Sequence, residues 1–168
     1  VDRFTVGAKI EREAAEARDQ TNMAPVINRF DESQINKAAF ALYHFNPLKA
    51  LTITAAGRAD QFGDSDTHAT WRLSAAWRIA ETGTKLRASY GTGAKAPTFF
   101  QRFEASNVGG TLVIPNPDLK VETSKGFDVG IDQSFLSDRL TGSVTYFENS
   151  IENMIEFTFL TPFSGQYQ

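Results

Sequence analysis

The chain has 168 residues, of which 41% are hydrophobic and 22% are charged, and its formal net charge is −3. This nearly balanced charge excludes a general electrostatic attraction to nucleic acid. With no cysteine and two histidines, the sequence also excludes a disulfide scaffold, a thiolate zinc site and a multi-histidine metal cage. The longest unbroken apolar run, residues 38–43, is far shorter than the roughly 18 residues that a membrane-spanning helix needs.

Apolar and polar residues alternate along much of the sequence with a period of two. In the clearest segment, Trp71, Leu73 and Trp77 alternate with arginine, serine and alanine. Such alternation predicts a strand with one apolar and one polar face. Strands are predicted in this way, in chain order, at residues 3–11, 35–45, 51–60, 70–80, 85–90, 126–132 and 140–147.

The connections between these predicted strands alternate in length. Short turns at one end of a sheet and long loops at the other are typical of an antiparallel membrane β-barrel. Tight turns are predicted at 46–49, 81–84 and 136–139, and longer links at 12–33, 61–69 and 94–123.

The chemistry of the two faces agrees with a barrel wall. The polar face carries Arg58, Arg72 and Arg87, which would suit a wet lumen. Aromatic residues near strand ends, such as Trp71 and Tyr90, would suit lipid headgroups. A soluble antiparallel sandwich alternates in the same way and stays open as an alternative.

The predicted strand at 35–45 is less regular than the others. If Tyr43 and Phe45 lie on its apolar face, then Phe40 and Leu42 fall on the polar face. The lone His44 on that second face is expected to be a lumen or packing residue and not a metal ligand.

Three short motifs follow one another in the second half of the chain. A Tyr-Gly-x-Gly-x-Lys-Ala-Pro segment at 90–97 precedes Asn-Pro-x-Leu-Lys-x-Glu-x-Ser at 116–124, and a Gly-x-x-x-Gly pattern follows at 126–130. Together they resemble the barrel of TonB-dependent outer-membrane receptors, and the likeness covers most of residues 33–157. Val121 departs from the family pattern, which usually has proline at that position.

The resemblance implies an all-β fold: an antiparallel meander of seven to eight strands, part of a transmembrane β-barrel of roughly 22 strands. Residues 1–168 would then form one partial barrel domain, without the plug domain, the energy-coupling box and the closing strand. The implied location is the Gram-negative outer membrane, with lipid around the strands. No cofactor and no nucleic-acid partner is implied.

The function that the resemblance implies is uptake of a scarce metal chelate such as cobalamin, a siderophore or haem. The TonB complex would supply energy through the plug. The compact spacing of strands and loops is somewhat closer to that of cobalamin-type receptors. The main alternative is a passive porin or an adhesin-type barrel, and a soluble β-sandwich is the second.

The residues give little support to an enzyme. The sequence contains no nucleophile elbow and no Ser-His-Asp arrangement. The glycine-rich segment 91–94 is followed by Lys95 and Ala96, without the Ser or Thr that a phosphate-binding loop requires. An outer-membrane lipase or protease is therefore not expected.

The link at 94–123 is the best candidate for ligand binding, because long loops on a rigid scaffold often carry function. Phe99, Phe100 and Phe103 would cover an apolar ligand face, and Arg102 would meet a carboxylate or phosphate. We expect the loop to close over the ligand, with Asn107, Gly109 and Gly110 permitting the motion. Alternatively, the aromatic residues pack the loop on itself.

A second, weaker candidate lies in the acidic link at 60–68. The spacing of Asp64, Asp66 and His68 is compatible with a calcium or transition-metal site. The simpler interpretation is a solvated acidic loop without a metal.

Overall fold

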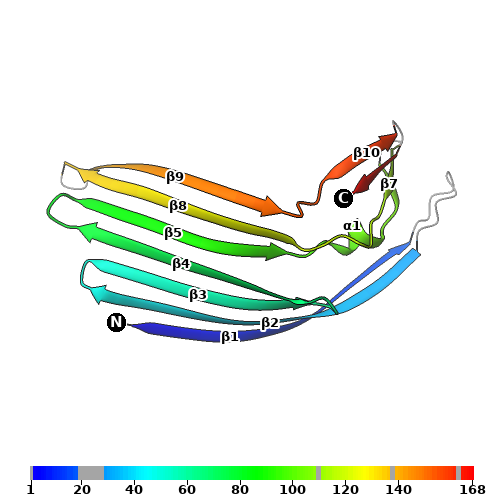
Figure 1. The fold of residues 1–168 in the computed structure, drawn as a ribbon, viewed down its shortest axis with the longest axis horizontal. Helices are drawn as coiled ribbons and strands as arrows, with labels where there is room; N and C mark the ends of the chain where they lie inside the picture. Colours follow the sequence, from blue (N-terminus) through cyan, green and yellow to red (C-terminus); the bar gives the residue numbers. More distant parts are fainter. Residues whose placement is uncertain (1, 19–28, 109–110, 137–138, 162–163) are drawn as a thin grey trace.

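The computed structural model describes residues 2–18, 29–108, 111–136, 139–161 and 164–168. Their largest unit is a seven-stranded antiparallel sheet with the strand order β1-β2-β3-β4-β5-β8-β9, which we call the main sheet (Figure 1). Its strands are β1 (Arg3–Arg18), β2 (Arg29–Leu48), β3 (Leu51–Phe62), β4 (Thr67–Ile79), β5 (Thr84–Lys95), β8 (Glu122–Phe135) and β9 (Leu140–Glu152).

A second, smaller unit lies at one end of the main sheet (Figure 1). It is a four-stranded sheet with the order β10-β11-β7-β6, which we call the loop sheet, accompanied by one short helix. We call this end of the main sheet the loop end, and the opposite end, with the tight turns, the turn end. The elements are α1 (Phe99–Phe103), β6 (Ser106–Val108), β7 (Thr111–Ile114), β10 (Phe157–Thr161) and β11 (Ser164–Tyr167).

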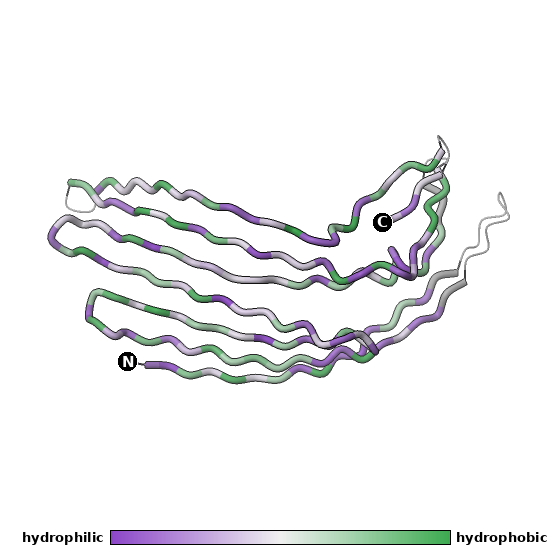
Figure 2. Tube along the Cα trace, viewed as in Figure 1, coloured by the Kyte–Doolittle hydropathy of each residue, from purple (hydrophilic) through white to green (hydrophobic). Residues whose placement is uncertain are grey.

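The register of the main sheet gathers apolar residues on one face. Leu51 of β3 pairs with Trp77, which pairs with Leu86; the row continues through Ile131 to Val144 of β9. Trp77 and Val144 keep 51% and 71% of their surface exposed. Figure 2 shows green segments interspersed with pale and purple ones along the strands, which agrees with a mixed apolar and polar composition of each strand.

The opposite face of the main sheet is polar and hollowed. One cavity of about 300 Å³ is lined by Thr54, Ser74, Arg87, Ser89, Asp128 and other residues of this face. Strand β2, whose predicted pattern was less regular, agrees with the expected faces. Phe40, Leu42 and His44 lie on the polar face, paired with Arg58, Ala56 and Thr54 of β3. His44 Nδ1 and Thr54 Oγ1 lie 3.0 Å apart, so this histidine contacts the neighbouring strand on the polar face.

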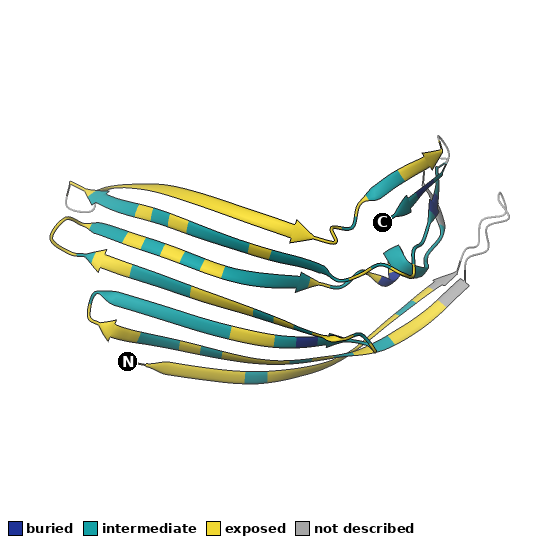
Figure 3. Ribbon diagram, in the orientation of Figure 1, coloured by how far each residue is buried: buried dark blue, intermediate teal, exposed yellow. Residues whose placement is uncertain are grey.

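The apolar side chains of the main sheet are not covered by the chain itself. Among the described residues, the only buried hydrophobic side chains are Phe99 and Val113, and neither belongs to the main sheet. The edge strand β9 is exposed along its whole length (Figure 3). An apolar face of this extent needs a non-aqueous surrounding or a partner. A soluble sandwich would cover it with a second sheet, so the arrangement favours the barrel wall.

Aromatic side chains form close pairs on the apolar face. Trp71 lies 5.3 Å from Tyr90, and Phe127 lies 5.9 Å from Tyr146, measured between ring centroids. On β2, Tyr43 and Phe45 stack with centroids 5.0 Å apart. Aromatic side chains on the apolar face of barrel strands are typical of a membrane interface. The part of the chain that the structure describes holds no helix long and apolar enough to cross a membrane.

Two predicted loops are shorter than expected. The long link at 12–33 is largely a paired ribbon, because β1 and β2 stay in register as far as Arg18 and Arg29. The link at 61–69 shrinks to residues 63–66, where Gly63 adopts φ +57° in a tight turn. Backbone pairing needs no apolar face, so the ribbon continues after the alternation that predicted the strand has ended.

The main sheet has seven strands, and the end of the chain does not begin an eighth. Residues 157–167 instead form the hairpin β10–β11, and β11 pairs in parallel with β7. The long link at 94–123 therefore contains secondary structure of its own, whereas the sequence predicted only a long loop there.

Candidate functional site

Helix α1 holds the four predicted ligand contacts, and its start is well defined by sequence. Thr98 follows a proline, its side chain accepts a hydrogen bond from Gln101 N, and the Gln101 side chain accepts one from Thr98 N. This reciprocal arrangement is a capping box, which satisfies amide groups that the first helical turn leaves unpaired. The helix is one turn long, so contacts with the rest of the loop must fix its position.

Phe99 and Phe103 pack against each other and not toward solvent. Phe99 is 8% exposed, and its ring centroid lies 6.1 Å from that of Phe103. Burial of the same region raises the pKa of the Glu104 carboxyl above its ordinary value. These two aromatic residues therefore hold the loop together, which is the alternative that the sequence left open.

Arg102 and Phe100 complete the predicted set. The Arg102 guanidinium lies 4.8 Å above the Phe103 ring, and its Nε donates to the carbonyl oxygen of Pro117 at 3.4 Å. Phe100 is 43% exposed and is the most accessible of the four predicted contacts. Of this set, Phe100 is the side chain best placed to meet a ligand.

Asn116 joins the helix to the end of the chain. Its backbone N donates to the carbonyl oxygen of Gln101 at 3.0 Å, and its Nδ2 donates to the carbonyl oxygen of Tyr167 at 3.0 Å. Its Oδ1 accepts from Asp118 N, which closes a local turn. The asparagine that the motif singled out is thus a junction between two loops.

Glu122 forms a second junction at the base of the loop. Its Oε2 accepts from Lys95 Nζ at 2.7 Å, and its Oε1 accepts from Ile155 N at 2.7 Å. Together with the β7–β11 ladder, these contacts join residues 96–121, which we call the β5–β8 loop, to residues 153–168, which we call the C-terminal segment. The sequence did not predict this union, because strands of three to five residues are too short to show a period.

The described residues do not assemble the metal candidates into a site. Asp64 and Asp66 are exposed in the β3–β4 turn, and the His68 ring lies 6.2 Å from that of Phe62. No group of three or more His, Cys, Asp or Glu residues in the described ranges is placed to hold a metal ion. Asp60, at 9% exposure, is occupied by a two-oxygen ion pair with Arg58.

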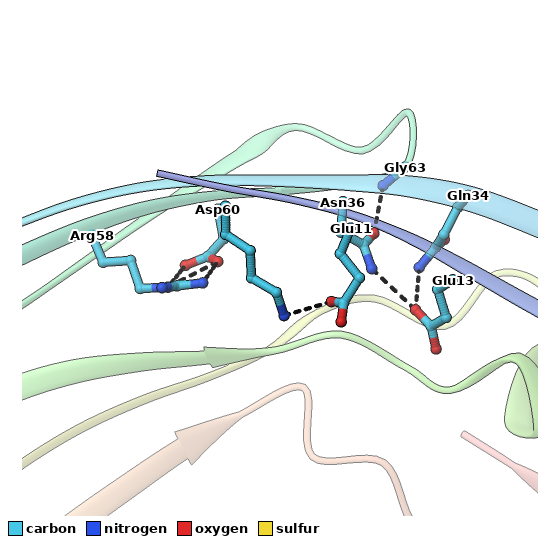
Figure 4. Close-up of polar contacts among 8 residues, drawn as sticks. Glu11, Glu13, Gln34, Asn36, Arg58, Asp60 and Gly63 are labelled. Atoms are coloured by element: carbon cyan, nitrogen blue, oxygen red, sulfur yellow. Dashed lines mark hydrogen bonds and ion pairs between the residues drawn. The ribbon is translucent and has the colours of Figure 1, made fainter. Parts of the chain in front are cut away.

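Polar contacts tie the β1–β2 ribbon to the β3–β4 turn (Figure 4). Glu13 Oε2 accepts from Gln34 Nε2 and from Asn36 Nδ2, each at 3.0 Å. Asn36 Oδ1 in turn accepts from Gly63 N at 3.1 Å. The ribbon therefore has a fixed base at the loop end of the polar face.

Ion pairs continue along the polar face of β4, β5 and β8. Arg72 donates to Ser89 Oγ at 2.6 Å, and the Ser89 hydroxyl in turn donates to Asp128. Arg87 Nε lies 3.2 Å from an Asp132 carboxylate oxygen. This pairing across strands suits a water-filled lumen, since each of these paired charges has both a partner and access to solvent.

Comparison with known proteins decides the family. Residues 3–168 match the family described as TonB dependent receptor-like, beta-barrel. The chain belongs to the TonB-dependent receptor family. Over 157 residues it is 32% identical to the vitamin B12 transporter BtuB of Vibrio vulnificus, covering 94% of the chain and 24% of the transporter. The chain thus spans about a quarter of that relative.

Solved structures show the same receptor fold. The siderophore receptor PirA of Pseudomonas aeruginosa superimposes with a TM-score of 0.79 at 19% identity, over 99% of this chain and 33% of PirA. The hemophore receptor HasR of Serratia marcescens, solved with its hemophore HasA and heme, gives a TM-score of 0.67 at 14% identity, over 99% of this chain and 37% of HasR. At these identities the likeness concerns the fold alone.

Proposed function

We propose that the chain forms part of the wall of an outer-membrane receptor that takes up a metal chelate, with a cobalamin-type ligand favoured. The observation that carries this proposal is the match to the TonB-dependent receptor barrel over residues 3–168. The 32% identity to a vitamin B12 transporter supports the ligand class. The exposed apolar face of the main sheet supports a lipid surrounding.

Residues 1–168 contribute one section of the barrel and the loops at one end of it. In this proposal the β5–β8 loop and the C-terminal segment face the compartment from which the ligand arrives, and exposed Phe100 and half-exposed Arg102 supply contacts to it. We propose that these loops move toward the ligand when it binds. Gly109 and Gly110, predicted to permit that motion, lie outside the described residues.

The proposed activity is transport and not catalysis. Energy would come from the TonB complex acting on a plug domain, and the strands would supply the fixed wall around it. The polar face of β4, β5 and β8 would form the wet side of the passage, since its charges are paired and partly solvated.

Ligand binding to the full-length receptor, purified in detergent, tests this function. Titration with cyanocobalamin, haem and a ferric siderophore should yield saturable binding of one class, with cyanocobalamin expected to bind most tightly. Cells that produce the receptor should accumulate that ligand only when TonB is active. Receptor that binds none of the three and accumulates none of them would overturn the proposal, and TonB-independent diffusion would favour a passive porin.

A further inference from the structure

The β5–β8 loop and the C-terminal segment together form a separate structural unit, which we call the loop unit. Among the described residues, no ladder joins a strand of the loop sheet to the main sheet. Strands β6 and β7 belong to the β5–β8 loop, whereas β10 and β11 belong to the C-terminal segment. The β7–β11 ladder, which pairs Val113 with Gly165, crosses from one loop to the other. The two loops therefore share one sheet.

Further contacts hold the loop unit together. Glu156 and Gln168 exchange two backbone hydrogen bonds, of 2.9 and 3.0 Å. The Phe157 ring lies so close to Gly165 that an added Cβ would collide with it. Both buried hydrophobic side chains of the described residues lie in this unit. The loop unit thus has its own ladders and its own small core, and such a region opens or moves as a whole.

The loop unit is connected to the main sheet at three neighbouring points. The chain leaves the main sheet after Lys95, at the end of β5, and returns at Glu122, at the start of β8. It leaves again after Glu152, at the end of β9. Because β5, β8 and β9 are neighbours, the three connections lie side by side at the loop end (Figure 1). A rigid body held in this way can turn, since a few connecting residues absorb the change in backbone angles.

The Glu122 carboxylate lies where these three connections meet. Its Oε2 accepts from Lys95 Nζ at the end of β5, and its Oε1 accepts from Ile155 N in the chain after β9, each at 2.7 Å. The Glu122 side chain is 12% exposed, whereas that of Lys95 is 65% exposed. Hydrogen bonds to an ionised group are stronger than neutral ones. One shielded carboxylate therefore binds all three connections in a single arrangement.

The backbone bends next to this carboxylate. Asn153 has φ +53°, in the left-handed region that asparagine adopts more readily than most residues. Residues 153–156 belong to no strand or helix, and β10 then runs in a different direction from β9 (Figure 1). The end of the β9 ladder, the bend and the amide bound by Glu122 thus fall within four residues. This coincidence marks the place about which the loop unit turns.

We propose that the loop unit turns as one rigid body about a pivot at Glu122, so that its two loops do not move separately. The inference rests on the proposed function for the direction of the motion, toward an arriving ligand, and adds the coupling of the two loops. Moving one loop alone would break the β7–β11 ladder and the hydrogen bond from Asn116 to Tyr167. Turning the whole unit keeps both and changes only the contacts at the pivot.

Distances between pairs of spin labels in the full-length receptor, in detergent and without ligand, test the pivot. Labels are attached to cysteines introduced at exposed positions; residues 1–168 contain no cysteine of their own. The inner pair, Asp118→Cys with Leu160→Cys, joins the two loops within the loop unit. The outer pair, Leu160→Cys with Asp64→Cys, joins the loop unit to the β3–β4 turn of the main sheet.

Glu122→Ala should at least double the width of the outer-pair distance distribution and leave that of the inner pair unchanged. Glu122→Gln keeps an acceptor for Ile155 N and should widen the outer pair to a smaller degree. Glu152→Ala is the matched control, because Glu152 is a neighbouring carboxylate that pairs with Lys125 of the main sheet; both distributions should match those of the wild type.

Two outcomes of this comparison would overturn the proposal. Equal widening of both pairs would mean that the loops move separately, and an unchanged outer pair in both Glu122 variants would mean that Glu122 is not the pivot. A heat-modifiability gel should report a folded barrel for each variant. If Glu122→Ala does not fold, Glu122→Gln decides the question, because it conserves the size of the side chain.

Cyanocobalamin added to the same labelled receptor tests the motion itself. The mean distance of the outer pair should shift, while that of the inner pair should stay the same. Bound cyanocobalamin that shifts neither pair, or that shifts both, would overturn the coupled motion. If cyanocobalamin does not bind, the favoured ligand class of the proposed function fails. The comparison of Glu122 variants uses no ligand and so still decides the pivot.

Discussion

The main sheet and the loop sheet bury their apolar side chains in opposite ways. In the main sheet, large residues such as Trp77 and Val144 stay exposed on one face, at 51% and 71%. In the loop region, Phe99 and Val113 are buried against other parts of the chain, at 8% and 6%. The apolar face of the main sheet must be covered by its surroundings. In the loop region, apolar side chains are covered by contacts between segments that are far apart in sequence.

This difference decides which features a sequence pattern can reveal. In a strand that faces lipid on one side and water on the other, apolar and polar residues alternate along the chain. The loop sheet has no such uniform surroundings. Its stability comes from individual contacts, such as Asn116 with Tyr167 and Glu122 with Ile155, and these contacts produce no periodic pattern in the sequence. Four experiments test this contrast.

Arginine on either face of β4 should give the largest difference. Ala75→Arg places a charge on the apolar face, in the row of Ile53 and Ala88, and should lower the free energy of unfolding of the full receptor by about 2–4 kcal/mol. Ser74→Arg, on the polar face, should cost less than about 1 kcal/mol. Urea titration in lipid vesicles measures both. An equal loss of unfolding free energy in both variants would show that the two faces share the same surroundings.

Replacing residues 100–111 with a short Gly/Ser linker should separate the loop sheet from the main sheet. The main-sheet ladder of β5 and β8 ends at Lys95 and Glu122, so barrel assembly should persist. The β6–β7 ladder is lost, and ligand affinity should fall at least tenfold, about 1.4 kcal/mol. Affinity is measured beside a heat-modifiability gel. A folded barrel with unchanged affinity would remove this loop from the binding surface.

Asn116→Ala should loosen the union of the two loops without touching the barrel wall. It removes the hydrogen bond from Nδ2 to the carbonyl oxygen of Tyr167, worth about 1 kcal/mol. Hydrogen exchange should therefore rise roughly fivefold in residues 164–167 and stay unchanged in β4 and β5. The nearby exposed Asp118→Ala serves as control. An equal rise for both variants would mean that the asparagine is not the junction.

Phe100→Ala should have the smallest effect. The side chain is 43% exposed, so its loss should spare the loop and lower ligand affinity about threefold, roughly 0.7 kcal/mol. Phe99→Ala should instead raise hydrogen exchange across residues 98–104, because it empties a buried position. If Phe100→Ala alters exchange as much as Phe99→Ala does, the two phenylalanines do not differ in role.

The sequence predicted the main sheet better than it predicted the candidate site. Alternation around Trp71 and Trp77 located β4, and the same pattern placed Phe40 and Leu42 on the polar face. The predicted strands end before β1 and β2 do, because the ribbon beyond Ile35 carries charged residues on both faces while its backbone remains paired. At the candidate site, the sequence singled out the aromatic residues that lie in α1. It could not tell which of Phe99 and Phe100 is buried, since the two are neighbours with the same side chain.

The amino-acid sequence by itself determined the receptor family, the strand faces and the arrangement of short turns and long loops. Each of these depends on residues one to four positions apart, or on motifs such as the one that contains Asn116. Only the tertiary structure decided that Asn116 reaches Tyr167, and that Gly165 makes room for the Phe157 ring. Such contacts require two loops to meet, and the chain that separates Val113 from Gly165 includes two full strands of the main sheet. A local sequence pattern carries no information about the contact between the two loops, because this contact depends on how the intervening strands pair and turn.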